Sequence, residues 1–100
     1  MFHSTHVFTG ETICRRPAQN YTEFTDELNR LQTLQQTFAQ SSIIERTALL
    51  QQFADSLAQN QERLAEMVCE EVGRCLHECR AEISKSIELI RYYVRLAPEL

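Results

Sequence analysis

The chain has 100 residues, 43% of them hydrophobic and 24% charged, which suits one small domain of ordinary globular composition. Its formal net charge of -4 argues against a nucleic-acid partner, because phosphate binding needs clustered Lys and Arg. No apolar stretch reaches the roughly 20 residues of a membrane span, and residues 1–10 lack the basic and apolar regions of a secretory signal. We therefore expect a cytoplasmic protein with no membrane partner.

Residues 1–20 form the first predicted unit, an extended segment with a hairpin. Between His6 and Cys14, β-branched and aromatic residues flank Thr9-Gly10, a pattern typical of two short strands joined by a turn, and Pro17 ends it. A lone two-stranded hairpin is marginal in water, so we expect it to rest on another part of the chain. His3 and His6 are expected in a loose N-terminus, without a metal.

Residues 21–100 form the second predicted unit, which is helical. After Pro17 the only residues that break helices are Gly73 and Pro98. The spacing of apolar residues predicts helices over 22–39, 43–59, 61–72 and 75–97. Ser42 and Glu45 have the pattern of a capping box, and Gly73 is expected to end a helix in the left-handed conformation. The fold class is mainly α, with four amphipathic helices after a short N-terminal β-hairpin.

Each predicted helix carries an apolar stripe that should be its packing face. On the first helix the stripe consists of Phe24, Leu28, Leu31, Leu34 and Phe38. On the second it consists of Ile43, Leu50, Phe53, Ala54 and Leu57, and on the third of Leu64, Met67, Val68 and Val72. On the last it consists of Leu76, Cys79, Ile83, Ile87, Ile90, Val94 and Ala97.

The four cysteines are expected to be reduced thiols rather than a disulfide framework. Cys75, His77 and Cys79 have a superficial metal-ligand spacing, with Cys69 as a possible further sulfur, but His77 would project about 200° from Cys75 around a helix. Cys75 near a helix start could suggest a nucleophile, yet no organised base accompanies it. We predict no catalytic residue and no metal ligand in this chain.

The acidic and basic residues of the last two helices fit a solvated face better than a carboxylate site. Their spacing predicts helix-surface pairs such as Glu70–Arg74 and Glu78–Glu82–Lys85. With Gly10 and Gly73 as the only glycines, no glycine-rich phosphate loop is possible. We therefore predict no cofactor-binding residue.

Five motifs in chain order resemble the N-terminal stretch of the NAD(P)-dependent aldehyde dehydrogenase superfamily. They are a T-G-E turn, an S-x-x-E-R helix start, an E-x-G-K-like element, an E-x-x-x-E-I element and an aromatic pair, here Thr9–Glu11, Ser42–Arg46, Glu71–Arg74, Glu78–Ile83 and Tyr92–Tyr93. The T-G-E turn and the Ile-rich last helix are most similar to the succinylglutamate-semialdehyde and related semialdehyde dehydrogenases. Two features depart from the family pattern: Arg74 stands where Lys is preferred, and the Trp common before S-x-x-E-R is missing.

The resemblance implies that this region is a helical layer at the edge of a cofactor-binding domain, packed on its parallel sheet. It implies a full-length enzyme that oxidises an aldehyde or semialdehyde to an acid with NAD or NADP. The family nucleophile lies in a G-Q-x-C-type context that is absent here, so this chain should bind no cofactor and be catalytically incomplete. Its expected partners are a second copy or the remainder of the dehydrogenase. The alternative is a small helical protein-interaction module.

Overall fold

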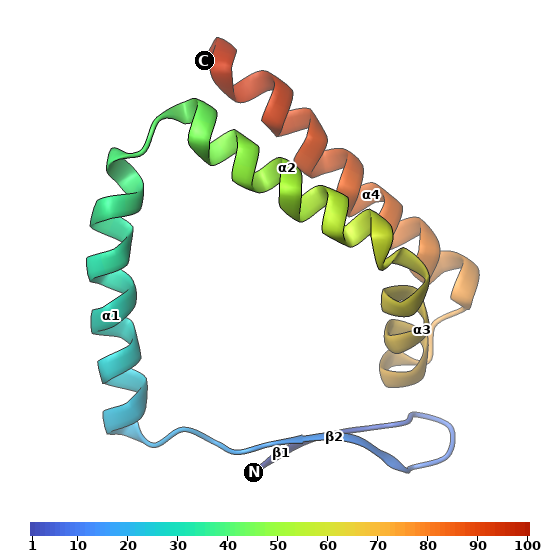
Figure 1. Ribbon diagram of the computed structural model, residues 1–100. Coiled ribbons are helices and arrows are strands. Elements are labelled where there is room, and N and C mark those ends of the chain that lie inside the picture. The colour runs from blue at the N-terminus through green and yellow to red at the C-terminus, as the bar shows by residue number, and fades with distance from the viewer.

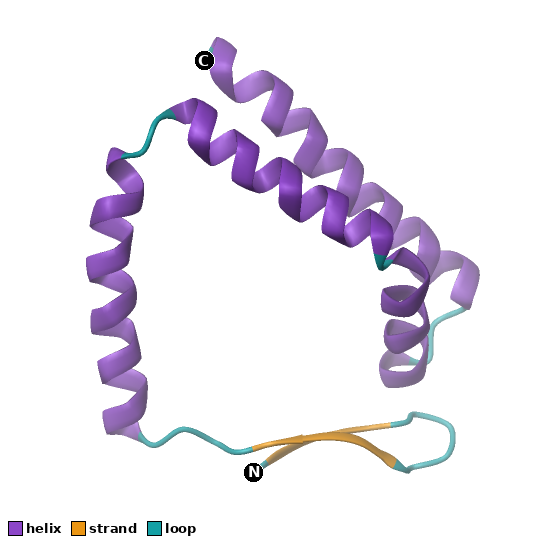
Figure 2. Ribbon diagram, in the orientation of Figure 1, coloured by secondary structure: helices purple, strands orange, loops and turns teal.

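A computed structural model describes all 100 residues and consists of one hairpin followed by four helices (Figure 1, Figure 2). The prediction of a mainly helical chain is confirmed, with helix boundaries within one residue of those expected. The elements are β1 (Phe2–Thr5), β2 (Thr12–Arg16), α1 (Tyr21–Gln40), α2 (Ile43–Gln59), α3 (Gln61–Val72), α4 (Leu76–Leu96) and the short 3-10 helix η1 (Ala97–Glu99). None of the helices is long and apolar enough to cross a membrane.

The hairpin exists, but its first strand lies nearer the N-terminus than predicted. β1 pairs antiparallel with β2, with His3 opposite Arg15, so His3 belongs to a strand and not to a loose terminus. His6 begins the connecting loop, where its Nδ1 accepts hydrogen bonds from the backbone N–H groups of Phe8 (3.2 Å) and Thr9 (3.3 Å). These bonds hold apolar residues in a loop although their composition is typical of a strand. The composition therefore predicted the first strand too far along the chain.

The hairpin rests on the C-terminal end of α3. The backbone N–H of Val7 donates a hydrogen bond to the carbonyl oxygen of Glu70 at 2.9 Å. Gly73 ends α3 with φ +78, as predicted, and a Cβ there would lie 2.9 Å from Cγ1 of Val7. Because Gly73 has no Cβ, it can end α3 in the left-handed conformation and also leave room for the hairpin loop.

The first two helices begin with capping boxes. The predicted box is present at Ser42, whose Oγ accepts from the N–H of Glu45 (3.1 Å) while Oε2 of Glu45 accepts from the N–H of Ser42 (2.8 Å). The same arrangement joins Asn20 and Glu23 at the start of α1, at 2.9 Å in both directions. The hydrogen bond from the Ser42 backbone holds the pKa of Glu45 below the ordinary glutamate value.

Replacement of Ser42 by alanine is expected to lower the free energy of unfolding by about 1 kcal/mol, because one N–H group at the start of α2 loses its acceptor. Urea unfolding followed by helical circular dichroism would measure it. The lowered pKa of Glu45 stabilises the fold above the ordinary glutamate pKa, and this contribution is lost as the pH falls through the folded-state value. The Ser42 hydroxyl also lowers the pKa of Glu45, so Ser42→Ala loses part of this contribution and its cost should shrink in acid. An equal loss at neutral and acid pH would contradict the reciprocal cap.

The packed part of the molecule consists of α2, α3 and α4. Figure 1 shows α2 and α4 side by side, with α3 crossing near the start of α4. The predicted face of α4 is correct, because all its members are buried or half-buried. The predicted stripe of α2 is only partly correct: Ala54 is buried, but Leu50 and Phe53 are exposed. Small residues at the contacts let the helices approach closely, and the buried residues are Thr47, Ala54, Ala65, Cys79 and Ile87.

α1 stands apart from the other helices (Figure 1). Its backbone approaches no other helix or strand, and its one side-chain link is Arg46, which donates hydrogen bonds to the carbonyl oxygens of Ala39 and Ser41 at 3.2 Å. The radius of gyration is 17.6 Å, against about 13 Å for a compact domain of this length. The apolar stripe of α1 is therefore present as predicted but covered by nothing in this chain.

Candidate functional site

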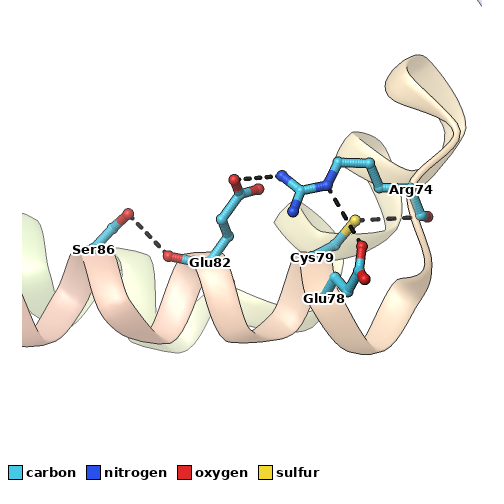
Figure 3. Close-up of polar contacts among 5 residues, drawn as sticks. All are labelled: Arg74, Glu78, Cys79, Glu82 and Ser86. Atoms are coloured by element: carbon cyan, nitrogen blue, oxygen red, sulfur yellow. Dashed lines mark hydrogen bonds and ion pairs between the residues drawn. The ribbon is translucent and has the colours of Figure 1, made fainter.

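The charged cluster around Arg74 is the most developed polar site in the chain (Figure 3). Nη1 of Arg74 lies 2.5 Å from Oε1 of Glu82, and its Nε lies 3.7 Å from Oε2 of Glu78. The hydrogen bond to Glu82 raises the pKa of Arg74. The three side chains line one wall of an open surface depression of about 360 Å³, and each is around half exposed.

This cluster differs from the predicted pairs. Arg74 contacts Glu78 and Glu82 rather than Glu70, and Lys85 makes no ion pair. Gly73 ends α3 before Arg74, so Arg74 no longer shares a helix face with Glu70 and turns to α4 instead. Exposed pairs of this kind contribute little to stability. Because the carboxylates already pair with a guanidinium in open solvent, the cluster has the character of a surface ion network rather than of a general-base site.

Cys79 is a buried packing residue. Its side chain is fully covered, and its Sγ lies 3.8 Å from the carbonyl oxygen of Arg74, as Figure 3 shows. Burial raises the pKa of this thiol and so favours its protonated form. A nucleophilic cysteine must instead be deprotonated. Cys79 therefore fills the space between helices as a small apolar side chain.

The other three cysteines are dispersed over the fold. Cys14 lies on β2, Cys69 on α3 and Cys75 at the start of α4, where its exposed side chain makes no hydrogen bond. All four thiols are unpaired. No three His, Cys, Asp or Glu side chains gather in a way that could hold a metal ion. Neither Cys75 nor His77 has the organised neighbours that activate a catalytic thiol.

The helix starts do not fit the pyrophosphate of a dinucleotide. An anion binds at a helix N-terminus when free N–H groups and the helix dipole face it. Here each α-helix carries a glutamate in its first turn, namely Glu23, Glu45, Glu62 and Glu78. On α1 and α2 the carboxylate itself occupies the cap. The starts of α1 and α2 therefore do not fit the pyrophosphate of NAD or NADP.

Two further ion pairs tie α4 to its neighbours. Arg80 binds the carboxylate of Glu62 on α3 through Nε (2.9 and 3.1 Å) and Nη2 (2.5 Å). Arg91 binds Asp55 on α2 at 3.2 Å. These contacts join residues 18 and 36 positions apart in the chain, so they fix how α4 lies rather than form a site. Sequence spacing could not identify them, because they depend on how separate helices meet.

The unusual feature of the molecule is its exposed apolar surface. The accessible surface is 8050 Å², whereas a compact monomer of 11.7 kDa exposes about 5,900 Å². Along α2, Leu49, Leu50 and Phe53 lie next to one another on the outer side, hereafter the α2 face, and are between 44% and 54% exposed. Exposed apolar surfaces of this kind are typical of interaction sites and ligand-binding grooves.

The chain belongs to the aldehyde dehydrogenase family, whose model matches residues 1–100. It is 24% identical over 97 residues to the NADP(+) succinate-semialdehyde dehydrogenase of Deinococcus radiodurans, covering 97% of this chain and 20% of that protein. It is 27% identical over 94 residues to a putative succinate-semialdehyde dehydrogenase of Mycolicibacterium smegmatis, covering 94% and 18%. It is 27% identical over 84 residues to a malonate-semialdehyde dehydrogenase of Listeria monocytogenes, covering 84% and 17%. The chain thus spans about a fifth of the length of these relatives.

Proposed function

We propose that this chain is the N-terminal segment of an NAD(P)-dependent aldehyde dehydrogenase that oxidises a semialdehyde to the acid. The family match over residues 1–100 supports the reaction class, and the names of the relatives support semialdehyde substrates and NADP. One observation carries the proposal: the family model matches all 100 residues, yet the chain spans only about a fifth of the length of its relatives. The proposal places the enzyme in the cytoplasm, as the composition leads us to expect.

In this proposal the segment has a structural role. The α2 face exposes about half of each of Leu49, Leu50 and Phe53, so covering the rest contributes about half of the roughly 1.5–3 kcal/mol that full burial of such a side chain is worth. The remainder of the dehydrogenase is the partner we propose for this face. Nucleophile, base and cofactor site would all come from that remainder.

The reading frame after codon 100 tests the proposal directly. Continuation into a P-x-N-P-type strand, an E-L-G-G-type base motif and a G-Q-x-C-type nucleophile is expected. A reading frame that ends without them would favour a small helical interaction module. Four helices that close on one another would favour that second candidate, whereas the apolar stripe of α1 packs on nothing in the chain.

The 100-residue chain is expected to reduce neither NAD nor NADP when mixed with small aldehydes, including succinate semialdehyde. Hydride transfer requires a cofactor held against a covalently bound substrate, and the carboxylates at the starts of α1 and α2 do not suit a pyrophosphate. Absorbance of the reduced nicotinamide gives the readout. The Deinococcus radiodurans relative, assayed in parallel, controls for substrate and cofactor quality.

Formation of reduced cofactor by the chain alone would contradict this expectation if it were abolished by Cys75→Ala. Cys75 is the thiol to test because it is exposed at a helix start, whereas Cys79 is buried. Cys14→Ala serves as the matched control, since Cys14 lies on the hairpin, away from α4. Loss of the activity in both variants would point to general thiol chemistry rather than to an active site.

A further inference from the structure

The loop between β1 and β2 is organised around one histidine. The backbone N–H of His6 donates to the carbonyl oxygen of Glu11, and the N–H of Gly10 donates to the carbonyl oxygen of His6, both at 2.8 Å. These bonds close the loop and hold the imidazole at its base. The amides of Phe8 and Thr9 donate to Nδ1 of this imidazole at 3.2 and 3.3 Å. The ring therefore binds two loop amides that no backbone carbonyl accepts.

The loop amide of Val7 points elsewhere and holds the hairpin to α3. Its N–H donates to the carbonyl oxygen of Glu70 at 2.9 Å, the one hydrogen bond between the hairpin and a helix. Val7 stands between His6 and Phe8, so the bonds of the imidazole on either side fix the direction of its N–H. The contact with α3 therefore depends on the acceptor at His6.

An imidazole nitrogen accepts a hydrogen bond only when it carries no proton. The two amides therefore require the neutral tautomer of His6, with its proton on Nε2. In the charged form both ring nitrogens are donors, so turning the ring over cannot restore an acceptor. Protonation of His6 thus sets a donor against the amides of Phe8 and Thr9.

No other charged group replaces these bonds. The titratable groups nearest to the loop on β1, on β2, in the loop itself and at the end of α3 are His3, Cys14, Glu11, Cys69, Glu70, Glu71 and Arg74. None of them forms an ion pair with His6. The glutamates attract an imidazolium at longer range and so favour the proton uptake that breaks the two bonds.

We propose that His6 is a pH-sensitive switch that holds the hairpin loop on α3 while its imidazole is neutral and releases the loop when it takes up a proton. Docking is then present at higher pH and is lost as the pH falls. The bonds that carry the proposal join residues of this chain to one another, so it depends neither on what covers the exposed helix faces nor on the proposed enzymatic function. The change should be local, because α2, α3 and α4 pack on one another without the hairpin.

Hydrogen exchange of the Val7 amide tests this switch in the 100-residue chain. Each rate is divided by that of an unstructured peptide at the same pH, because exchange itself depends on pH. Protection of Val7 should fall about tenfold between about pH 8 and about pH 5, the window in which histidine titrates and most carboxylates do not. The amide of Gly73, which donates to Cys69 at the end of α3, should keep its protection.

His6→Asn separates the acceptor from the titration, because an asparagine side chain can accept from the N–H groups of a following turn but takes up no proton. Its Val7 protection should be the same at both pH values. His3→Asn is the matched control: His3 lies on β1 with an exposed side chain, and the variant should keep the tenfold change.

The ¹⁵N signals of the His6 ring test the tautomer in the wild-type chain, without any substitution. At neutral pH the proton should lie on Nε2. A neutral ring with its proton on Nδ1, wild-type Val7 protection that is equal at both pH values, or a tenfold change that persists in His6→Asn would overturn the proposal.

Discussion

Ile87→Ala is expected to lower the free energy of unfolding by about 2–5 kcal/mol, the usual range for removing a buried aliphatic side chain. Ile87 is 4% exposed and lies in the middle of the α4 face that packs on α2 and α3. Only four other residues of the chain are buried, so few neighbours can move to fill the space. Since domains of this size are stable by only about 5–15 kcal/mol, the loss should be a large part of the total.

Urea unfolding at one fixed chain concentration measures this effect, because association would otherwise change the apparent stability. Leu89→Ala is the matched control: it removes the same number of carbon atoms from the same helix, but Leu89 is 56% exposed. Its cost should stay within about 0.5 kcal/mol. Ile83→Ala and Ile90→Ala, at half-buried positions, should lie between the two. A Leu89→Ala cost equal to that of Ile87→Ala would show that another face of α4 is the buried one.

The helices could be predicted because their signals are local. Scarce glycine and proline, a capping box at Ser42 and a terminating Gly73 act within a few residues, so the sequence carries them directly. The cap at Asn20 has the same pattern, Asn-x-x-Glu, so the sequence also carries the start of α1 directly.

Contacts between elements could not be predicted in the same way. The hydrogen bonds that His6 accepts in the loop keep Val7 out of a strand, and the composition of residues 6–8 carries no sign of them. The spacing of apolar residues placed Leu50 and Phe53 on the packing face of α2. It could not show that α4 covers only part of that face. The pairing of Arg74 with Glu82 depends on the direction in which the chain leaves Gly73.

In the candidate site, too, local properties of residues could be predicted and contacts between elements could not. That the cysteines are unpaired was predicted, and the burial of Cys79 agrees with its place on the α4 stripe. The stripe of α1 was read correctly as an apolar face, yet its spacing could not show that nothing in the chain covers it. Amphipathic patterning predicts that a face will be buried, not which polypeptide buries it.

Gly73→Ala is expected to cost more than the about 1–2 kcal/mol that a left-handed backbone imposes on a residue with a side chain. The added Cβ would lie 2.9 Å from Cγ1 of Val7, which is too close for ordinary packing, and 3.4 Å from its Cγ2. Relief requires the hairpin loop to move away from α3. The hydrogen bond from the Val7 N–H to Glu70, 2.9 Å long, should then weaken, and faster amide exchange of Val7 would report it.

Val7→Ala separates the backbone cost from the clash, because it removes both Cγ atoms that the new Cβ would meet. In a double-mutant cycle, Gly73→Ala should cost less in the Val7→Ala background than in the wild-type chain, with the difference giving the steric part. The backbone part should remain, since Gly73 keeps φ +78 in either background. Equal costs in both backgrounds, with a Val7 amide that exchanges equally fast in the wild-type and Gly73→Ala chains, would mean that the hairpin does not dock on the end of α3.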